Sequence, residues 1–145
     1  MTQTNIDRFD EVAAKVLTAV YERFPEPINL DPNTIGMIEE TPELTAYGEF
    51  IYSEGWIELD SFIHWTAKWL AEEGYLAERR ASVYTLSATG FKSMKHVAQP
   101  EIGSETLGDK IKHASAEGAS ATTSKLMDQF LSIGATVLTK TMGID

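Results

Sequence analysis

The chain has 145 residues, of which 43% are hydrophobic and 23% charged, and it contains no cysteine. This composition is typical of a soluble globular protein whose core needs neither metal ions nor disulfides, and it excludes disulfide scaffolds, thiol catalysis, cysteine-ligated zinc and iron–sulfur clusters. The net charge of −10 opposes binding to phosphate backbones and anionic membranes unless a local basic patch reverses the field.

The first ten residues are polar and acidic, and they lack the basic start and apolar run of a secretory signal. The sequence contains no run of about 18 uncharged apolar residues, the minimum for a membrane-spanning helix. We therefore expect a cytoplasmic, soluble protein without a membrane span.

Residues 5–24 carry apolar side chains at steps of three and four, the spacing of one face of an amphipathic helix. Pro25 and Pro27 end this helix, because proline lacks the helical donor and biases the preceding residue towards extended geometry. Residues 28–42 contain several proline and glycine residues and predict an irregular connection, within which Asp31 can start one helical turn.

The apolar residues of segment 45–59 fit neither a period of two nor one of 3.6 residues, and Gly55 interrupts them. We expect a helix over residues 42–53, followed by a short extended piece. Asp60 is then the predicted N-cap of the next helix, because its carboxylate can accept from the free N–H groups of the first turn.

The helix predicted over residues 60–73 has an unusually wide apolar stripe, and Gly74 ends it. Residues 75–86 predict a β-hairpin, with two short strands around the charged run 78–80. Ser87 can cap a final short helix that stops before Pro100. The wide stripe consists of two adjacent rows: Ile63, Ala67 and Leu70, and Phe62, Trp65, Thr66 and Trp69.

The composition changes about two thirds of the way along the chain, where glycine recurs and residues 114–124 are almost wholly Ala, Ser, Thr, Gly and Glu. This stretch is either a flexible linker or a helix of small residues. Leu107 and Ile111 predict a short helix before it, and a strong apolar spacing predicts a second helix after it. We therefore expect a domain of residues 1–100 and a helical C-terminal appendage of residues 101–145.

The segment WLAEEGYL at residues 69–76, the hairpin after it and the segment YTLSATGF at residues 84–91 resemble the winged-helix superfamily. In that superfamily the helix that leads into EEGYL, the end of the first segment, occupies the recognition-helix position. The hairpin is the wing, and the second segment forms the return strand and the next helix. The resemblance covers residues 5–98. It implies a mainly α (α+β) fold, with a winged-helix-like domain, a small β-hairpin wing and the C-terminal helical appendage.

Winged-helix proteins often bind DNA, with the recognition helix in the major groove and basic wing residues on the phosphates. Residues 60–96 carry five basic side chains against four acidic ones, whereas residues 1–59 carry three against twelve. A DNA interface uses roughly six to ten phosphate contacts, and one protomer has too few basic side chains to supply them. The alternative interpretation of the arginines in the hairpin is a solvated turn in which they pair with nearby glutamates. The resemblance implies that the DNA contacts are Ser61, His64 and Lys68 on the helix and Arg79 and Arg80 in the hairpin.

The sequence lacks a glycine-rich phosphate loop, a His-Glu-x-x-His pair and a Gly-x-Ser-x-Gly elbow, so we expect no enzymatic activity, no cofactor and no metal site. Adjacent carboxylates are interpreted as solvated surface. Trp56, Trp65 and Trp69 either fill the core, which we favour, or stack on a base, a ligand or a partner.

The apolar face of the last predicted helix needs a cover, because in water it would expose on the order of several hundred Å². Three hosts are open: its own domain, a second copy, or a partner or membrane surface. The residues of this face are Leu126, Phe130, Ile133, Val137 and Leu138.

We therefore expect a non-enzymatic winged-helix-like protein that acts through a protein partner or as a homo-oligomer. If the tail is the interface, replacing Phe130 and Val137 by aspartate dissociates an oligomer. The alternative is a DNA-binding transcriptional regulator that uses the helix at 60–73 and the wing at 75–86, with dimerisation through the tail doubling its weak basic surface; the net charge disfavours nucleic acid.

Overall fold

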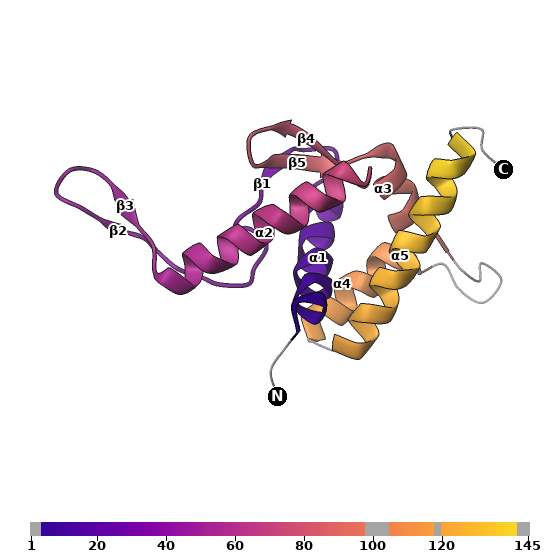
Figure 1. Cartoon of the computed structure of the whole chain (residues 1–145), viewed down its shortest axis with the longest axis horizontal. Coiled ribbons are helices and arrows are strands. Elements are labelled where there is room, and N and C mark those ends of the chain that lie inside the picture. Colours follow the sequence, from indigo (N-terminus) through magenta and orange to yellow (C-terminus); the bar gives the residue numbers. More distant parts are fainter. Residues whose placement is uncertain (1–3, 98–104, 118–119, 142–145) are drawn as a thin grey trace.

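The computed structural model describes residues 4–97, 105–117 and 120–141, which form a mainly helical α+β fold (Figure 1). Its elements in chain order are α1 (Asn5–Glu22), β1 (Ile28–Asn29), β2 (Glu43–Leu44), β3 (Phe50–Ile51), α2 (Glu54–Glu72), β4 (Leu76–Arg80), β5 (Val83–Leu86), α3 (Ala88–Met94), α4 (Leu107–Glu117) and α5 (Ser120–Thr141).

Helix α1 confirms the first predicted element and supplies one wall of the core. Thr4 caps it, since its hydroxyl accepts from the N–H of Asp7 at 3.1 Å. Its apolar face is buried along its length, with Val12 and Val16 inaccessible to solvent. The helix ends just before the cis peptide bond between Phe24 and Pro25, where proline was expected to stop it.

The connection after α1 is irregular as predicted, but it also contributes an unpredicted strand. Asp31 starts a turn, because its Oδ1 accepts from both the N–H (2.8 Å) and the hydroxyl (2.9 Å) of Thr34. Just before this turn, the two residues of β1 pair antiparallel with β5. A two-residue strand is too short to leave an alternating pattern in the sequence.

The helix predicted over residues 42–53 is wrong: β2 and β3 form a hairpin there instead. The turn is closed by Thr45, whose carbonyl accepts from the N–H of Gly48 at 3.0 Å and whose hydroxyl accepts from that of Glu49 at 3.0 Å. Gly48 has φ of 81°, a conformation that glycine adopts without steric cost. We call residues 43–51 the arm, because they project from the body of the molecule in Figure 1.

Helix α2 begins six residues earlier than predicted, so the expected N-cap at Asp60 is wrong and Asp60 lies inside the helix. Ser53 is the cap, and its hydroxyl accepts from the N–H of Trp56 at 3.2 Å. The predicted stop at Gly74 is confirmed. There the N–H of Tyr75 donates to the carbonyl of Leu70, the hydrogen bond of a Schellman motif, and Gly74 has φ of 93°.

The predicted hairpin of residues 75–86 is confirmed as β4 and β5, and β5 lies between β4 and β1 in a three-stranded antiparallel sheet. The turn at its tip contains Ser82, with φ of 65°. Ser87 caps α3 as predicted, accepting from the N–H of Gly90 at 3.0 Å.

Helices α4 and α5 pack against α1 and α3, and their apolar residues belong to the same hydrophobic core (Figure 1). Met127 and Phe130 are inaccessible to solvent. Hydrogen bonds attach α5 to the rest: Ser124 donates to Asp10 at 2.8 Å, Ser93 donates to the carbonyl of Phe130 at 2.9 Å, and Tyr75 donates to that of Leu131 at 2.9 Å.

Most of residues 114–124, predicted as either a linker or a helix, is helical. Residues 114–117 end α4 and residues 120–124 begin α5, while residues 118 and 119 lie outside the described residues. The small side chains of this stretch therefore allow two helices to meet closely, as the buried Ala114 illustrates.

Candidate protein-interaction site

Two of the predicted DNA contacts on α2 bind other parts of the same chain. The His64 ring lies between two partners, with Nε2 3.4 Å from a carboxylate oxygen of Asp60 and Nδ1 3.4 Å from the hydroxyl of Ser82 in the turn between β4 and β5. The ammonium of Lys68 lies 3.0 Å from Glu78 on β4, and this hydrogen bond lowers the pKa of the Glu78 carboxyl. These two side chains therefore link α2 to the β4–β5 hairpin.

The remaining predicted DNA contacts lie on α2 and on β4. Ser61 is half-buried on α2. Arg79 and Arg80 are exposed on β4, and the Nε of Arg79 donates to the hydroxyl of Thr85 at 2.9 Å. A helix-turn-helix has a helix directly before its recognition helix, whereas the segment from residue 23 to residue 53 contains no helix and carries the arm.

Of the three hosts proposed for the tail, the chain's own core covers most of the apolar face of α5. Phe130 is fully buried, and its ring centroid lies 5.2 Å from that of Tyr75. Leu126 and Ile133 pack against the same core, and Val137 is half-buried. The side chain of Leu138 lies outside the described residues. An aspartate at residue 130 would therefore disrupt the core of one chain.

The surface that does remain apolar lies elsewhere, on the arm and along α2. Within the described residues, nine large hydrophobic side chains are exposed, and seven of them belong to these two elements. Tyr47 at the tip of the arm is 93% exposed, and Trp65 in the middle of α2 is 70% exposed. We call this surface the aromatic face; it consists of Leu44, Tyr47, Phe50, Ile51, Ile57, Trp65 and Trp69.

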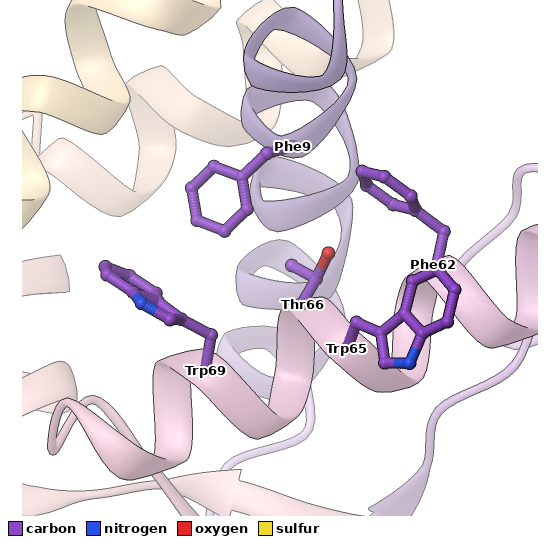
Figure 2. A pocket seen from close by; sticks show the side chains of 5 residues that line it. All are labelled: Phe9, Phe62, Trp65, Thr66 and Trp69. Atoms are coloured by element: carbon purple, nitrogen blue, oxygen red, sulfur yellow. The ribbon is translucent and has the colours of Figure 1, made fainter.

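An open groove of about 330 Å³ lies between α1 and α2, and Trp65 and Trp69 of the aromatic face line it. Figure 2 shows Phe9 and Trp69 on one side of Thr66, and Phe62 and Trp65 on the other. The rings in each pair are roughly perpendicular, with centroids 5.4 Å apart for Phe9 and Trp69 and 6.5 Å apart for Phe62 and Trp65. This is the edge-to-face geometry that aromatic pairs prefer, so the walls of the groove present ring faces as well as ring edges.

A cation from the same chain already contacts one of these rings. The guanidinium carbon of Arg8 lies 4.4 Å from the centroid of Phe62, and Arg8 also donates to Glu58 at 2.8 Å. The distance is within the roughly 6 Å at which a cation is attracted by the quadrupole of an aromatic ring. The ring of Phe62 is therefore accessible to positive charge.

The chain around the arm is strongly acidic, because residues 24–67 contain no lysine or arginine. One of its carboxylates, Glu40, holds the base of the arm against α2, accepting from the N–H and the hydroxyl of Ser53, both at 2.7 Å. Both hydrogen bonds lower the pKa of Glu40, and the one from the Ser53 hydroxyl has the larger effect. The nine carboxylates of the segment are Glu26, Asp31, Glu39, Glu40, Glu43, Glu49, Glu54, Glu58 and Asp60.

The interpretation of the three tryptophans as core residues is confirmed for Trp56 and wrong for Trp65. Trp56 is stacked on Tyr52 at 3.7 Å, and its indole N–H donates to Asn33 at 2.6 Å. Trp69 is 40% exposed, between the two extremes. The unusual width of the apolar stripe is the signal in the sequence, since the fold buries the row of Ile63, Ala67 and Leu70 completely but leaves Trp65 and Trp69 of the second row exposed.

Within the part of the chain that the structure describes, no helix combines the length and the apolar character needed to cross a bilayer. Comparison of the chain with protein-family models, with curated proteins and with solved structures finds no match.

Proposed function

We propose that this chain is a non-enzymatic, winged-helix-like protein whose role is to bind another protein through the aromatic face. The observation that carries the proposal is the gathering of exposed large hydrophobic side chains on the arm and α2, while the other surfaces of the described chain carry two. Soluble monomers rarely leave such a patch uncovered, and tryptophan and tyrosine supply much of the binding energy at protein interfaces.

The size of the aromatic face fits a protein partner. Its seven side chains together expose on the order of 800 Å², taking roughly 150–250 Å² for each fully exposed large side chain. A stable interface of standard size buries about 800 Å² on each partner. The exposed apolar area of the arm and α2 is therefore of the size that one side of a specific interface buries.

The winged-helix-like part of the proposal is supported by topology. Apart from the arm, which is inserted before α2, a helix, a short strand, a long helix and a hairpin follow one another, and β5 pairs with both β1 and β4. The DNA-binding alternative has less support, since Lys68 and Arg79 have partners within the chain and the arm occupies the segment where a helix-turn-helix has the helix before its recognition helix.

The proposal is tested by photo-crosslinking in cells that make the full chain. A photoreactive phenylalanine derivative is placed at Tyr47, at Trp65 or, as a matched control, at the exposed His113 on α4. We expect a crosslinked product of one defined mass from the positions on the aromatic face and none from the control. A product of twice the mass of the 16.1 kDa chain identifies a second copy as the partner.

The proposal fails if neither Tyr47 nor Trp65 gives a defined product. It also fails if His113 gives the same set of products, because contact would then not depend on the aromatic face.

A further inference from the structure

The groove between α1 and α2 is lined almost entirely by aromatic rings. Phe9, Phe62, Trp65 and Trp69 supply four of its five lining residues, and Thr66 is the only hydroxyl among them. A group that enters the groove therefore loses its water and meets very few hydrogen-bonding partners. This excludes ligands whose polar atoms need donors or acceptors, because an unpaired buried polar group costs free energy.

The charge around the groove favours a cation. Glu72 is exposed and lies three residues after Trp69, so its carboxylate adds negative charge at one end of the groove. Glu58, four residues before Phe62, pairs with Arg8, and Lys68 pairs with Glu78, so neither of these ion pairs leaves an uncompensated positive charge beside the groove.

These two conditions together select a particular cation. An ordinary ammonium brings three N–H donors that the groove cannot satisfy. A trimethylated ammonium keeps the positive charge, has no N–H group and presents methyl groups to the rings. Such cations are held by the faces of tryptophan and phenylalanine through the ring quadrupole, as Arg8 is held over Phe62 at 4.4 Å.

We propose that the aromatic groove binds the trimethylammonium group of a methylated lysine side chain presented by the partner protein. This inference rests on the proposed function, since it names the group by which the partner enters the aromatic face. The groove is open, with Trp65 70% exposed, so it suits a side chain that reaches in from a neighbouring protein surface better than a small molecule that needs full enclosure.

The test is an NMR titration of the full chain that follows the three indole N–H signals. The probes are three short peptides of the same sequence that carry trimethyllysine, lysine, or an uncharged analogue with a tert-butyl group in place of trimethylammonium. We expect the trimethyllysine peptide to shift the signals of Trp65 and Trp69. Trp56 is an internal control, because its indole N–H is bonded to Asn33. The tert-butyl peptide should bind about two- to thirty-fold more weakly, the range of an exposed to a desolvated cation–π contact. The lysine peptide should also bind more weakly, because the groove cannot pair its three N–H donors.

Two variants test whether binding depends on the groove. Trp65→Ala should weaken binding of the trimethyllysine peptide about ten-fold or more, and it should remain folded because the ring is mostly exposed. His113→Ala removes an exposed side chain on α4, outside the aromatic face, and it should leave the affinity unchanged.

The inference is overturned if the tert-butyl peptide binds as tightly as the trimethyllysine peptide, if the lysine peptide does, or if no peptide shifts Trp65 or Trp69. Choline and vesicles of phosphatidylcholine complete the series, and equal or tighter binding of either one overturns the assignment to a protein side chain. Each of these outcomes can occur while crosslinking from Tyr47 and Trp65 still succeeds, so failure of the inference and failure of the proposed function remain distinguishable.

Discussion

Asp10 is a buried carboxylate at the contact between the first and the last helix. It is 8% exposed on α1, and the hydroxyl of Ser124 on α5 donates to it at 2.8 Å. Burial raises its pKa, the hydrogen bond from Ser124 lowers it, and repulsion from Asp128 and Asp7 raises it further, so the net shift is upward. Keeping this carboxylate ionised in the folded chain therefore costs free energy.

Replacing Asp10 by asparagine should raise the free energy of unfolding at about pH 7. A carboxyl whose pKa is raised by folding favours the folded state at low pH, and that contribution is lost as the pH rises through the raised pKa. Asparagine keeps an acceptor for Ser124 but carries no charge, so the gain of Asp10→Asn should shrink as the pH falls below the raised pKa. Urea unfolding at about pH 7 and about pH 3 measures the difference.

The control for this prediction is Asp128→Asn, which removes one of the charges that repel Asp10 without touching a buried carboxylate. Asp128→Asn should raise the free energy of unfolding at neutral pH by less than Asp10→Asn does. A loss of stability in Asp10→Asn at neutral pH would show that the charged form of Asp10 is favoured by folding, contrary to the sign derived from its surroundings.

At the scale of elements, the sequence predicts those whose caps and stops are local. Thr4, Ser87 and Gly74 act on backbone groups within a few residues, so the ends that they set can be inferred from the chain alone. Ser53 caps α2 just as locally, through the N–H of Trp56, but it is also held by Glu40, 13 residues earlier in the chain. The sequence shows two polar residues that can serve as the cap, Ser53 and Asp60, and the contact with Glu40, which favours Ser53, is formed only in the fold.

The arm could not be predicted from the sequence for a related reason. Its strands are two residues each, and their side chains are exposed on both faces, so no alternation of apolar and polar residues marks them. The candidate site was equally hard to predict, because Phe9 on α1 and Trp69 on α2 meet only in the fold. The aromatic residues of α2 can be identified from the sequence, but which of them stay exposed to solvent depends on how α1 packs against α2.

Replacing the arm, residues 43–51, by a short glycine–serine turn should leave the fold intact. The side chains of this segment are almost all exposed, and its two strands pair only with each other. Since Glu43 pairs with Ile51, the two ends lie close enough for a short turn to join them. We expect the free energy of unfolding to change by less than about 1 kcal/mol, typical of surface changes, while crosslinking from position 65 is lost or strongly reduced.

Thermal unfolding followed by circular dichroism measures the stability of this variant beside the parent chain. A large drop in the melting temperature would mean that the arm supports the body. Unchanged crosslinking from position 65 would instead show that the arm is not part of the interaction site and that the groove is sufficient.

At the scale of the whole molecule, one core joins segments from both ends of the sequence. Residues of α1, α3, α4 and α5 share it, and Phe130 of α5 is among its largest fully buried side chains. The apolar spacing of the last helix was visible in the sequence, but spacing alone does not say which surface covers it. The small residues Gly108 and Gly134 allow that cover to come from the same chain, because each contacts a tyrosine ring, Tyr21 and Tyr75 respectively, where a Cβ atom would collide.

Phe130→Ala should destabilise the whole fold by about 3–5 kcal/mol, the usual cost of truncating a buried phenylalanine. The ring is fully buried and lies 5.2 Å from that of Tyr75, so its loss leaves a cavity between α5 and the rest. Denaturant unfolding gives the value, and Ile133→Ala, which truncates a half-buried side chain of the same helix, should cost less. A loss below about 1 kcal/mol would mean that α5 contributes little to the core.

The joining of distant segments also governs how the chain acquires its structure during synthesis. Domains generally fold as units once their residues have left the ribosome. Here the face of α1 that receives Ser124 and the core around Phe130 stay uncovered until α5 has emerged, although α1 is made first. A nascent chain halted after the β4–β5 hairpin therefore displays the buried side of α1 to chaperones and proteases, and only a chain extended through α5 can cover it.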